Sequence, residues 1–95
     1  MLGGFMIGKR VPIVEAQIND ALESVRLALL RRIKEKGDLS FASTHEALGI
    51  IDEEHHELTE AVRSNSHRRF ENECMDIAVA CVFAIACKRA GTLDW

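Results

Sequence analysis

Residues 74–87 read CMDIAVACVFAIAC, and this stretch decides the fold of the chain. It is apolar at nearly every position, and Asp76 is its only charged residue. A helix that is apolar all round is expected to be buried all round. The stretch is shorter than the ~20 residues that a helix needs to span a bilayer. It therefore predicts the central helix of a small globular domain and no contact with a membrane.

Burying Asp76 in such surroundings costs free energy, because a buried carboxylate must be paired, protonated or bound to a cation. Glu73 precedes it by three residues, so both acids lie on one face of the helix. Neutralisation by basic residues is one interpretation. The nearest candidates, however, cluster at the preceding turn and are expected to face solvent: Arg63, Arg68 and Arg69. A bound cation is the favoured interpretation.

A second acid pair lies in the preceding helical segment and is located by helical phase. The expected core face of that segment is the row Leu48, Ile51, His55, Leu58 and Val62. The adjoining row holds Ala47, Ile50, Glu54, Glu57 and Ala61. Glu54 and Glu57 are therefore predicted to border the core, one turn apart.

The two acid pairs can face each other if the helices pack antiparallel. Glu57 lies eight residues before Asn65 and Glu73 lies eight after it, so the pairs stand at similar heights. Four facing carboxylates repel strongly, and Mg²⁺, or alternatively Mn²⁺, would neutralise them because hard cations prefer oxygen ligands. The predicted metal ligands are Glu54, Glu57, Glu73 and Asp76.

The remaining elements follow from periodicity and capping residues. An amphipathic helix is expected from Pro12 to about Lys36, with Gly37 as its stop. Ser43 and Glu46 have the spacing of a capping box before a helix at Thr44–Arg63. After the polar turn formed by residues 64–66, the third helix is expected at His67–Ala90, stopped by Gly91.

The fold is thus predicted to be all-α, a bundle of three main helices per chain that is completed by oligomerisation. We expect one helical domain at residues 11–91. Residues 1–10 are expected to form an N-terminal arm that need not be ordered and has no signal-peptide pattern. Residues 92–95 are expected to form a loosely held tail, unless Trp95 docks on a neighbour. A homodimer or homotetramer is the expected assembly.

Composition narrows the class of protein further. The formal net charge is −3, which gives no global basic field for nucleic acid. Three cysteines are spaced seven and six residues apart, unlike a CxxC zinc pair: Cys74, Cys81 and Cys87. They are expected to be reduced core thiols, which favours a cytoplasmic protein.

The histidines offer a different interpretation of the acids. Asp52-x-x-His55 and Glu53-x-x-His56 match the Glu-x-x-His spacing of di-iron bundles, although only one helix carries such a match. A ferritin-like metal-binding bundle is therefore an alternative. His55, on the predicted apolar face, is expected to be a hydrogen-bonded core residue.

Two acidic motifs carry a family resemblance. Glu53-Glu54-His55-His56-Glu57, followed after fifteen residues by Glu73-Cys74-Met75-Asp76, fits the pattern EExxE…ExxD. Over residues 39–91 the chain resembles the all-alpha nucleoside triphosphate pyrophosphohydrolases, the MazG-like superfamily. Asn72 is a departure, because relatives often carry a second acid at that position. This departure and the short chain keep a non-catalytic interaction protein as a further alternative.

The resemblance implies magnesium-dependent hydrolysis of a nucleoside triphosphate between the α and β phosphates, giving a nucleoside monophosphate and pyrophosphate. The four predicted ligands correspond to the family's magnesium ligands, and Glu53 to an acid that orients or deprotonates the attacking water. Candidate cations for the phosphates are Lys34, Lys36 and Lys88. The aromatic residue that stacks on the base is left open between Phe41, Phe83 and Trp95.

Overall fold

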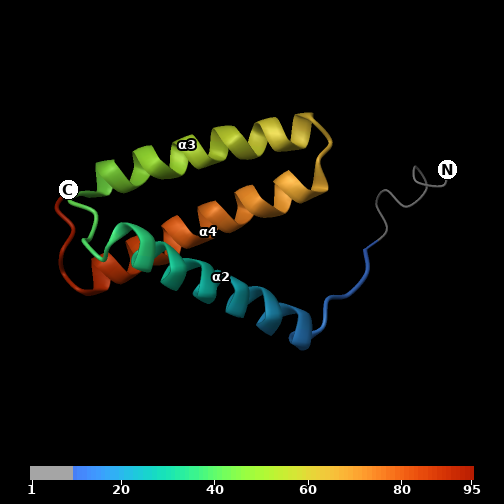
Figure 1. The fold of residues 1–95 in the computed structure, drawn as a ribbon, viewed down its shortest axis with the longest axis horizontal. Coiled ribbons are helices and arrows are strands. Elements are labelled where there is room, and N and C mark those ends of the chain that lie inside the picture. The colour runs from blue at the N-terminus through green and yellow to red at the C-terminus, as the bar shows by residue number, and fades with distance from the viewer. Residues whose placement is uncertain (1–9) are drawn as a thin grey trace.

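The computed structural model describes residues 10–95, which form three α-helices and no strand (Figure 1). The helices are α2 (Glu15–Lys36), α3 (Thr44–Arg63) and α4 (His67–Arg89). The all-α prediction is confirmed. Residues 1–9, nearly all of the expected N-terminal arm, lie outside the described part of the chain. Within residues 10–95 no helix has the length and apolarity needed to cross a membrane.

α3 and α4 form an antiparallel hairpin around a tight polar turn (Figure 1). Asn65 adopts φ 56°, a left-handed conformation that asparagine tolerates well. The Ser66 side chain then caps α4 by accepting a hydrogen bond from the Arg69 backbone N–H at 3.1 Å. Gly91, at φ 74°, follows the end of α4, so the predicted bounds of this helix are right to within one residue.

The start of α3 is capped in a variant of the predicted manner. The Ser43 hydroxyl accepts from the Glu46 backbone N–H at 3.1 Å, as expected. The Glu46 carboxylate accepts from the Ala42 N–H at 2.7 Å, one residue before the cap. Both contacts satisfy donors that the helix itself leaves free.

Residues 92–95 run beside this start of α3 and are held by backbone contacts. The Thr44 N–H donates to the Asp94 carbonyl at 2.9 Å, and the Asp94 N–H donates to the Ala42 carbonyl at 3.0 Å. The Thr44 hydroxyl donates to the Trp95 carbonyl at 2.6 Å. The expectation of a loosely held tail is therefore wrong for its backbone, although the Trp95 residue is 83% exposed.

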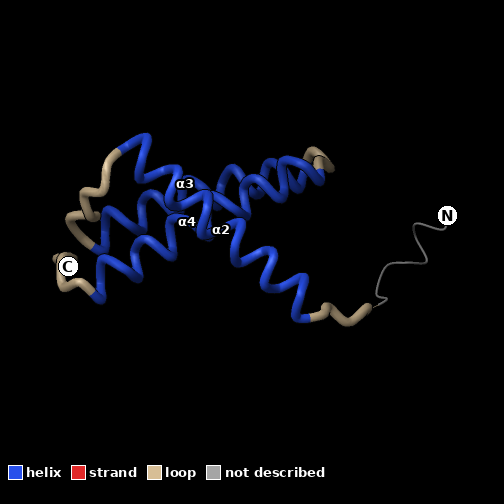
Figure 2. The backbone as a smooth tube through the Cα atoms, turned by 60° about the horizontal axis from the view of Figure 1, so that its bottom comes forward, coloured by secondary structure: helices blue, strands red, loops and turns tan. Residues whose placement is uncertain are grey.

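α2 packs on α4 near its own C-terminal end and diverges from the hairpin toward its N-terminus (Figures 1 and 2). It begins at Glu15, three residues later than predicted, and Pro12 lies in the segment before it. The Gln17 side chain accepts from the Val14 N–H at 3.0 Å, but valine at the cap has no oxygen to return a bond. Gly37, at φ 93°, follows the end of the helix as predicted.

The core is small and lies between α3 and α4. Its buried residues are Ala47, Ala61, Val79, Ala80 and Cys87. The predicted core face of α3 is wrong by one position, because Leu48 is 55% exposed and Val62 is 54% exposed. The alanine row faces α4 instead, since small side chains let the two helices approach closely.

Candidate metal centre

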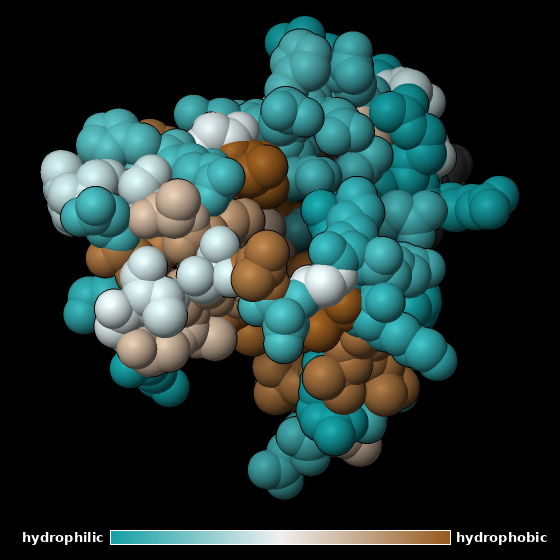
Figure 3. Space-filling view, turned by 60° about the vertical axis from the view of Figure 1, so that its left-hand side comes forward, coloured by the Kyte–Doolittle hydropathy of each residue, from teal (hydrophilic) through white to brown (hydrophobic). Residues whose placement is uncertain are grey.

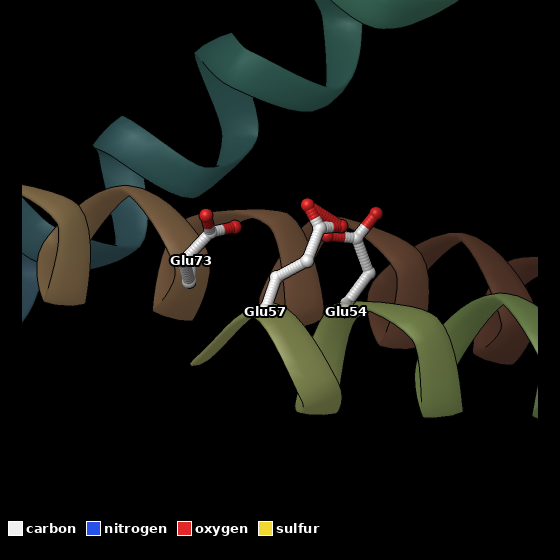
Figure 4. Close-up of side chains that lie close together, drawn as sticks. All are labelled: Glu54, Glu57 and Glu73. Atoms are coloured by element: carbon white, nitrogen blue, oxygen red, sulfur yellow. The ribbon is translucent and has the colours of Figure 1, made fainter. Parts of the chain in front are cut away.

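Three glutamates come together at the seam between α3 and α4. Glu54 and Glu57 project from α3 and Glu73 from α4, and one carboxylate oxygen of each lies within 4.8 Å of the others. Figure 4 shows their carboxylates gathered on one side of the seam, where α2 crosses. Three of the four predicted ligands are thus neighbours in space, and we call them the acid cluster.

The corrected core face of α3 explains this geometry. Ala47 and Ala61 are buried against α4, and Glu54 lies seven residues from each, in the same row. Glu57 follows one turn later in that row. The glutamates thus share a row with the packed alanines but are not themselves buried, so they lie at the border of the core as predicted.

The acid cluster is electrostatically strained as it stands. Partial burial raises the pKa of Glu54, and the charges of Asp76, Glu57 and Glu73 raise it further. The pKa of Glu73 is likewise raised by desolvation and by Glu57 and Asp76. The Arg32 guanidinium opposes the shift at Glu54, and Arg69 opposes it at Glu73. The protein's own cations leave a net repulsion among the acids.

One oxygen of the cluster has no hydrogen-bonding partner. Glu54 Oε2 is buried and accepts no hydrogen bond from the described residues. Most buried acceptors in proteins are satisfied, and leaving one unpaired costs free energy. A cation at this oxygen would remove both the unmet contact and the repulsion.

Asp76 lies at the edge of the cluster. It contributes no oxygen to the group of three within 4.8 Å, but its charge acts on both Glu54 and Glu73. The sequence predicts that Asp76 is buried, but the structure buries it only in part. The reason is that α4 is not covered all round: Val82 is 42% exposed and Ile85 is 51% exposed. Asp76 also lines a cavity between α2 and α4.

Glu53, His55 and His56 of α3 do not belong to the group of three glutamates. Glu53, the predicted catalytic residue, is exposed and adjoins Glu54 along the helix. His55 is exposed, so its predicted place in the core is wrong. His56 faces Glu60, with 3.8 Å between Nε2 and Oε2. Among residues 10–95 the group able to hold a metal contains glutamates and no histidine.

The structure changes the choice of candidate cations. Lys36 lines the cavity that contains Asp76, whereas Lys34 and Lys88 are exposed and lie outside it. Arg31 and Arg32 line the same cavity, and the sequence interpretation missed both. The sequence does contain a signal for Arg32, because this residue continues the apolar stripe of the helix one turn after Ala28 and so lies on the face that packs.

The donor set fits a hard divalent cation. All nearby ligand atoms are carboxylate oxygens, which suit Mg²⁺ or Mn²⁺ better than softer metals. The unpartnered Glu54 Oε2 and the raised pKa values of Glu54 and Glu73 fit a place where a bound cation would be stabilising.

Comparison with known proteins adds no further assignment: no family model, no curated protein and no solved structure matches this chain. Membership of the MazG-like superfamily therefore stays a prediction that rests on the two acidic motifs.

Proposed function

We propose that the protein is a magnesium-dependent nucleoside triphosphate pyrophosphohydrolase of the MazG-like type. The observation that carries the proposal is the acid cluster, in which three carboxylates lie within 4.8 Å and one buried oxygen lacks a partner. Its residues fall within the EExxE and ExxD motifs, so sequence and geometry support the same site.

The proposed reaction needs the acids to hold charge and water in place. Mg²⁺, if bound, would supply positive charge for the phosphates and would activate the attacking water. Glu54, Glu57, Glu73 and Asp76 would hold the ion. Water attacks one of the two phosphorus atoms that flank the bridging oxygen between the α and β phosphates. The bond from that phosphorus to the bridging oxygen breaks, and a nucleoside monophosphate and pyrophosphate are released. Glu53, which is exposed and adjoins Glu54 along the helix, would orient the water or take its proton.

A ferritin-like function finds less support. It would need histidines beside the carboxylates, but His55 is exposed and His56 faces Glu60. A non-catalytic metal-binding bundle stays the rival and would bind Mg²⁺ without hydrolysing any nucleotide. The three cysteines are unpaired thiols, and we propose the reducing cytoplasm as the compartment.

We also propose that the chain is at least a homodimer, and the accessible surface supports this. The chain exposes 7633 Å² at a mass of 10.6 kDa. A folded monomer of this mass exposes about 5,500 Å². Even if about 1,400 Å² is subtracted for residues 1–9, the value for nine residues of a fully extended chain, roughly 700 Å² per chain stays in excess. A standard interface buries about 800 Å² per partner.

Apolar side chains mark where a second copy would pack. No large side chain among residues 10–95 is fully buried, while Ile18 and Leu22 on α2 are 49% and 62% exposed. Figure 3 shows apolar residues at the surface among polar ones on one face of the molecule. Two copies would bury such residues and complete the bundle.

The test of the proposed reaction is a pyrophosphate-release screen over NTPs and dNTPs with Mg²⁺ or Mn²⁺. We expect turnover of at least one nucleotide, abolished by EDTA and by Asp76→Asn. Glu71→Gln, at an exposed glutamate outside the cluster, is the matched control and should retain activity. Full magnesium-dependent turnover by Asp76→Asn would contradict the proposal. A failure to release pyrophosphate from any nucleotide would contradict it as well.

A further inference from the structure

Two neighbouring cavities lie beside the acid cluster. The first, of about 360 Å³, lies between α2 and α4 and is lined by charged and polar side chains, among them Arg31, Arg32, Glu35, Lys36, Asn72 and Asp76. We call it the charged cavity. The second, of about 160 Å³, is lined mainly by apolar residues, among them Leu29, Ile33, Leu39, Phe41, Ile50 and Phe83. We call it the apolar cavity.

The two cavities share part of their walls. Arg32, Lys36 and Val79 line both. The charged cavity also lies close to the acid cluster, because Asp76 lines it and the charge of Asp76 acts on Glu54 and Glu73. The two cavities therefore adjoin each other, and Arg32, which lines both, also acts on Glu54 of the acid cluster.

The charged cavity has the composition of a polyphosphate site. Three cations of α2, Arg31, Arg32 and Lys36, line it against two acids, Glu35 and Asp76. Guanidinium groups match phosphate oxygens in a bidentate way, and lysine adds a point charge. A cation held by the acid cluster would bind phosphate from the opposite side, so the phosphate chain would lie between metal and α2.

The apolar cavity suits a flat ring. Phe41 and Phe83 meet edge to face inside it, with ring centroids 5.1 Å apart and an interplanar angle of 83°. Its volume corresponds to about five water molecules, which is room for a heterocycle but not for a whole nucleotide. Trp95, the remaining aromatic candidate, is 83% exposed and lines neither cavity.

We propose that the two cavities form one bipartite nucleotide site. The phosphates lie in the charged cavity on Arg31, Arg32 and Lys36, and the base lies in the apolar cavity against Phe41 and Phe83. The assignment rests on the proposed function for the identity of the ligand. It makes Arg32 and Lys36 the cations shared by both halves, and it excludes Lys34, Lys88 and Trp95 from direct binding.

The experiment separates the two halves with different probes. Calorimetric titration of the full chain in Mg²⁺ would use a nucleoside triphosphate with a non-hydrolysable α,β linkage and, separately, inorganic tripolyphosphate, which has no ring. Arg32→Gln should weaken binding of both probes about tenfold or more, because it removes charged hydrogen bonds to phosphate. Phe83→Leu should weaken the nucleotide about five- to tenfold and leave tripolyphosphate unchanged.

Matched controls keep the result interpretable. Arg26→Gln changes an exposed arginine of the same helix, and Phe70→Leu changes an exposed phenylalanine outside both cavities; neither should alter binding. If Phe83→Leu loses helical circular dichroism, Phe41→Leu provides the second test of the apolar cavity. Each variant is compared at matched helical content.

Failure of this inference differs from failure of the proposed function. Unchanged tripolyphosphate affinity in Arg32→Gln, an equal loss of both probes in Phe83→Leu, or no binding by the unmodified chain would overturn the bipartite site. If binding responds as expected but no nucleotide is hydrolysed, the bipartite site stands and the enzyme assignment falls. If Asp76→Asn abolishes turnover while Arg32→Gln and Phe83→Leu bind normally, the enzyme stands and the substrate lies elsewhere.

Discussion

The α3–α4 hairpin and α2 differ in how much of their apolar surface is buried within the chain. Every buried apolar residue of the described chain belongs to the hairpin, whereas α2 has none. α2 instead exposes large apolar side chains along its length, including Leu27 and Leu30 at 49% and 48%. The hairpin is a folded unit with its own core, and α2 is a helix that still needs a partner surface.

This difference divides the candidate site in two. The hairpin supplies the acids, held in register by alanine packing, and α2 supplies the cations from a loosely covered helix. The acidic half should therefore be rigid and the basic half adjustable. Covering the outer face of α2 would fix the distance between the two halves.

The largest expected effect comes from the acids of the hairpin. Glu54→Gln should lower magnesium-dependent pyrophosphate release at least about 100-fold, because it removes a charged ligand at the buried end of the cluster. The measurement is turnover at saturating Mg²⁺, with Glu71→Gln as the control. Activity within a few-fold of the unmodified protein would show that the cluster is not the catalytic half.

The next effect concerns the outer face of α2. Leu22→Glu should weaken self-association at least about 100-fold, because it buries an unpaired charge in an apolar contact. Light scattering across a dilution series measures this, and Ser24→Glu, on the opposite side of the helix, is the control. If Leu22→Glu has the same molecular mass as the unmodified protein at every concentration, α2 does not form the interface.

A third test compares overpacking in the two regions. Ala61 is fully buried between α3 and α4, so Ala61→Leu should destabilise the protein by about 1–3 kcal/mol. Ala16→Leu, on the exposed α2, should change stability by less than about 0.5 kcal/mol. Urea unfolding measures both. Equal effects would mean that the hairpin is no better packed than α2.

The start of α2 can be improved where the starts of α3 and α4 cannot. Val14→Asp supplies the side-chain acceptor that Ser43 and Ser66 already give the other helices, and should raise stability by about 1 kcal/mol. This corresponds to a rise of about 4–8 °C in the melting temperature. A drop in helical content on this substitution would contradict the observed helix start.

The smallest effect is a pH dependence of the metal-free hairpin. The pKa values of Glu54 and Glu73 lie above their ordinary value of 4.5, so the folded chain binds more protons than the unfolded chain between the two pKa values. The free energy of unfolding should therefore fall as pH rises through the folded pKa values. Urea unfolding in EDTA, against Glu54→Gln as the reference, measures this fall. Mg²⁺ should remove it, and a rise in stability with pH relative to Glu54→Gln would contradict it.

Local signals account for most of what could be predicted from the sequence. The bounds of α3 follow from Ser43 and from the polar turn, and the ends of α2 and α4 follow from Gly37 and Gly91. These are interactions within a few residues of each other, so a single sequence contains them. The pairing of the acids was also predictable, because residues three apart on a helix must share a face.

The sequence alone thus determined three helices and two acid pairs, while the tertiary structure decided which surfaces meet. Phase analysis placed the large apolar row of α3 in the core, but the alanine row packs on α4 because only small residues permit that approach. The same rotation puts Glu54 and Glu57 beside the contact and leaves Leu48 and Val62 exposed. Arg32 meets the acids only because α2 crosses the hairpin there. Contacts between distant segments depend on how helix surfaces fit, and periodicity along one helix does not contain that information.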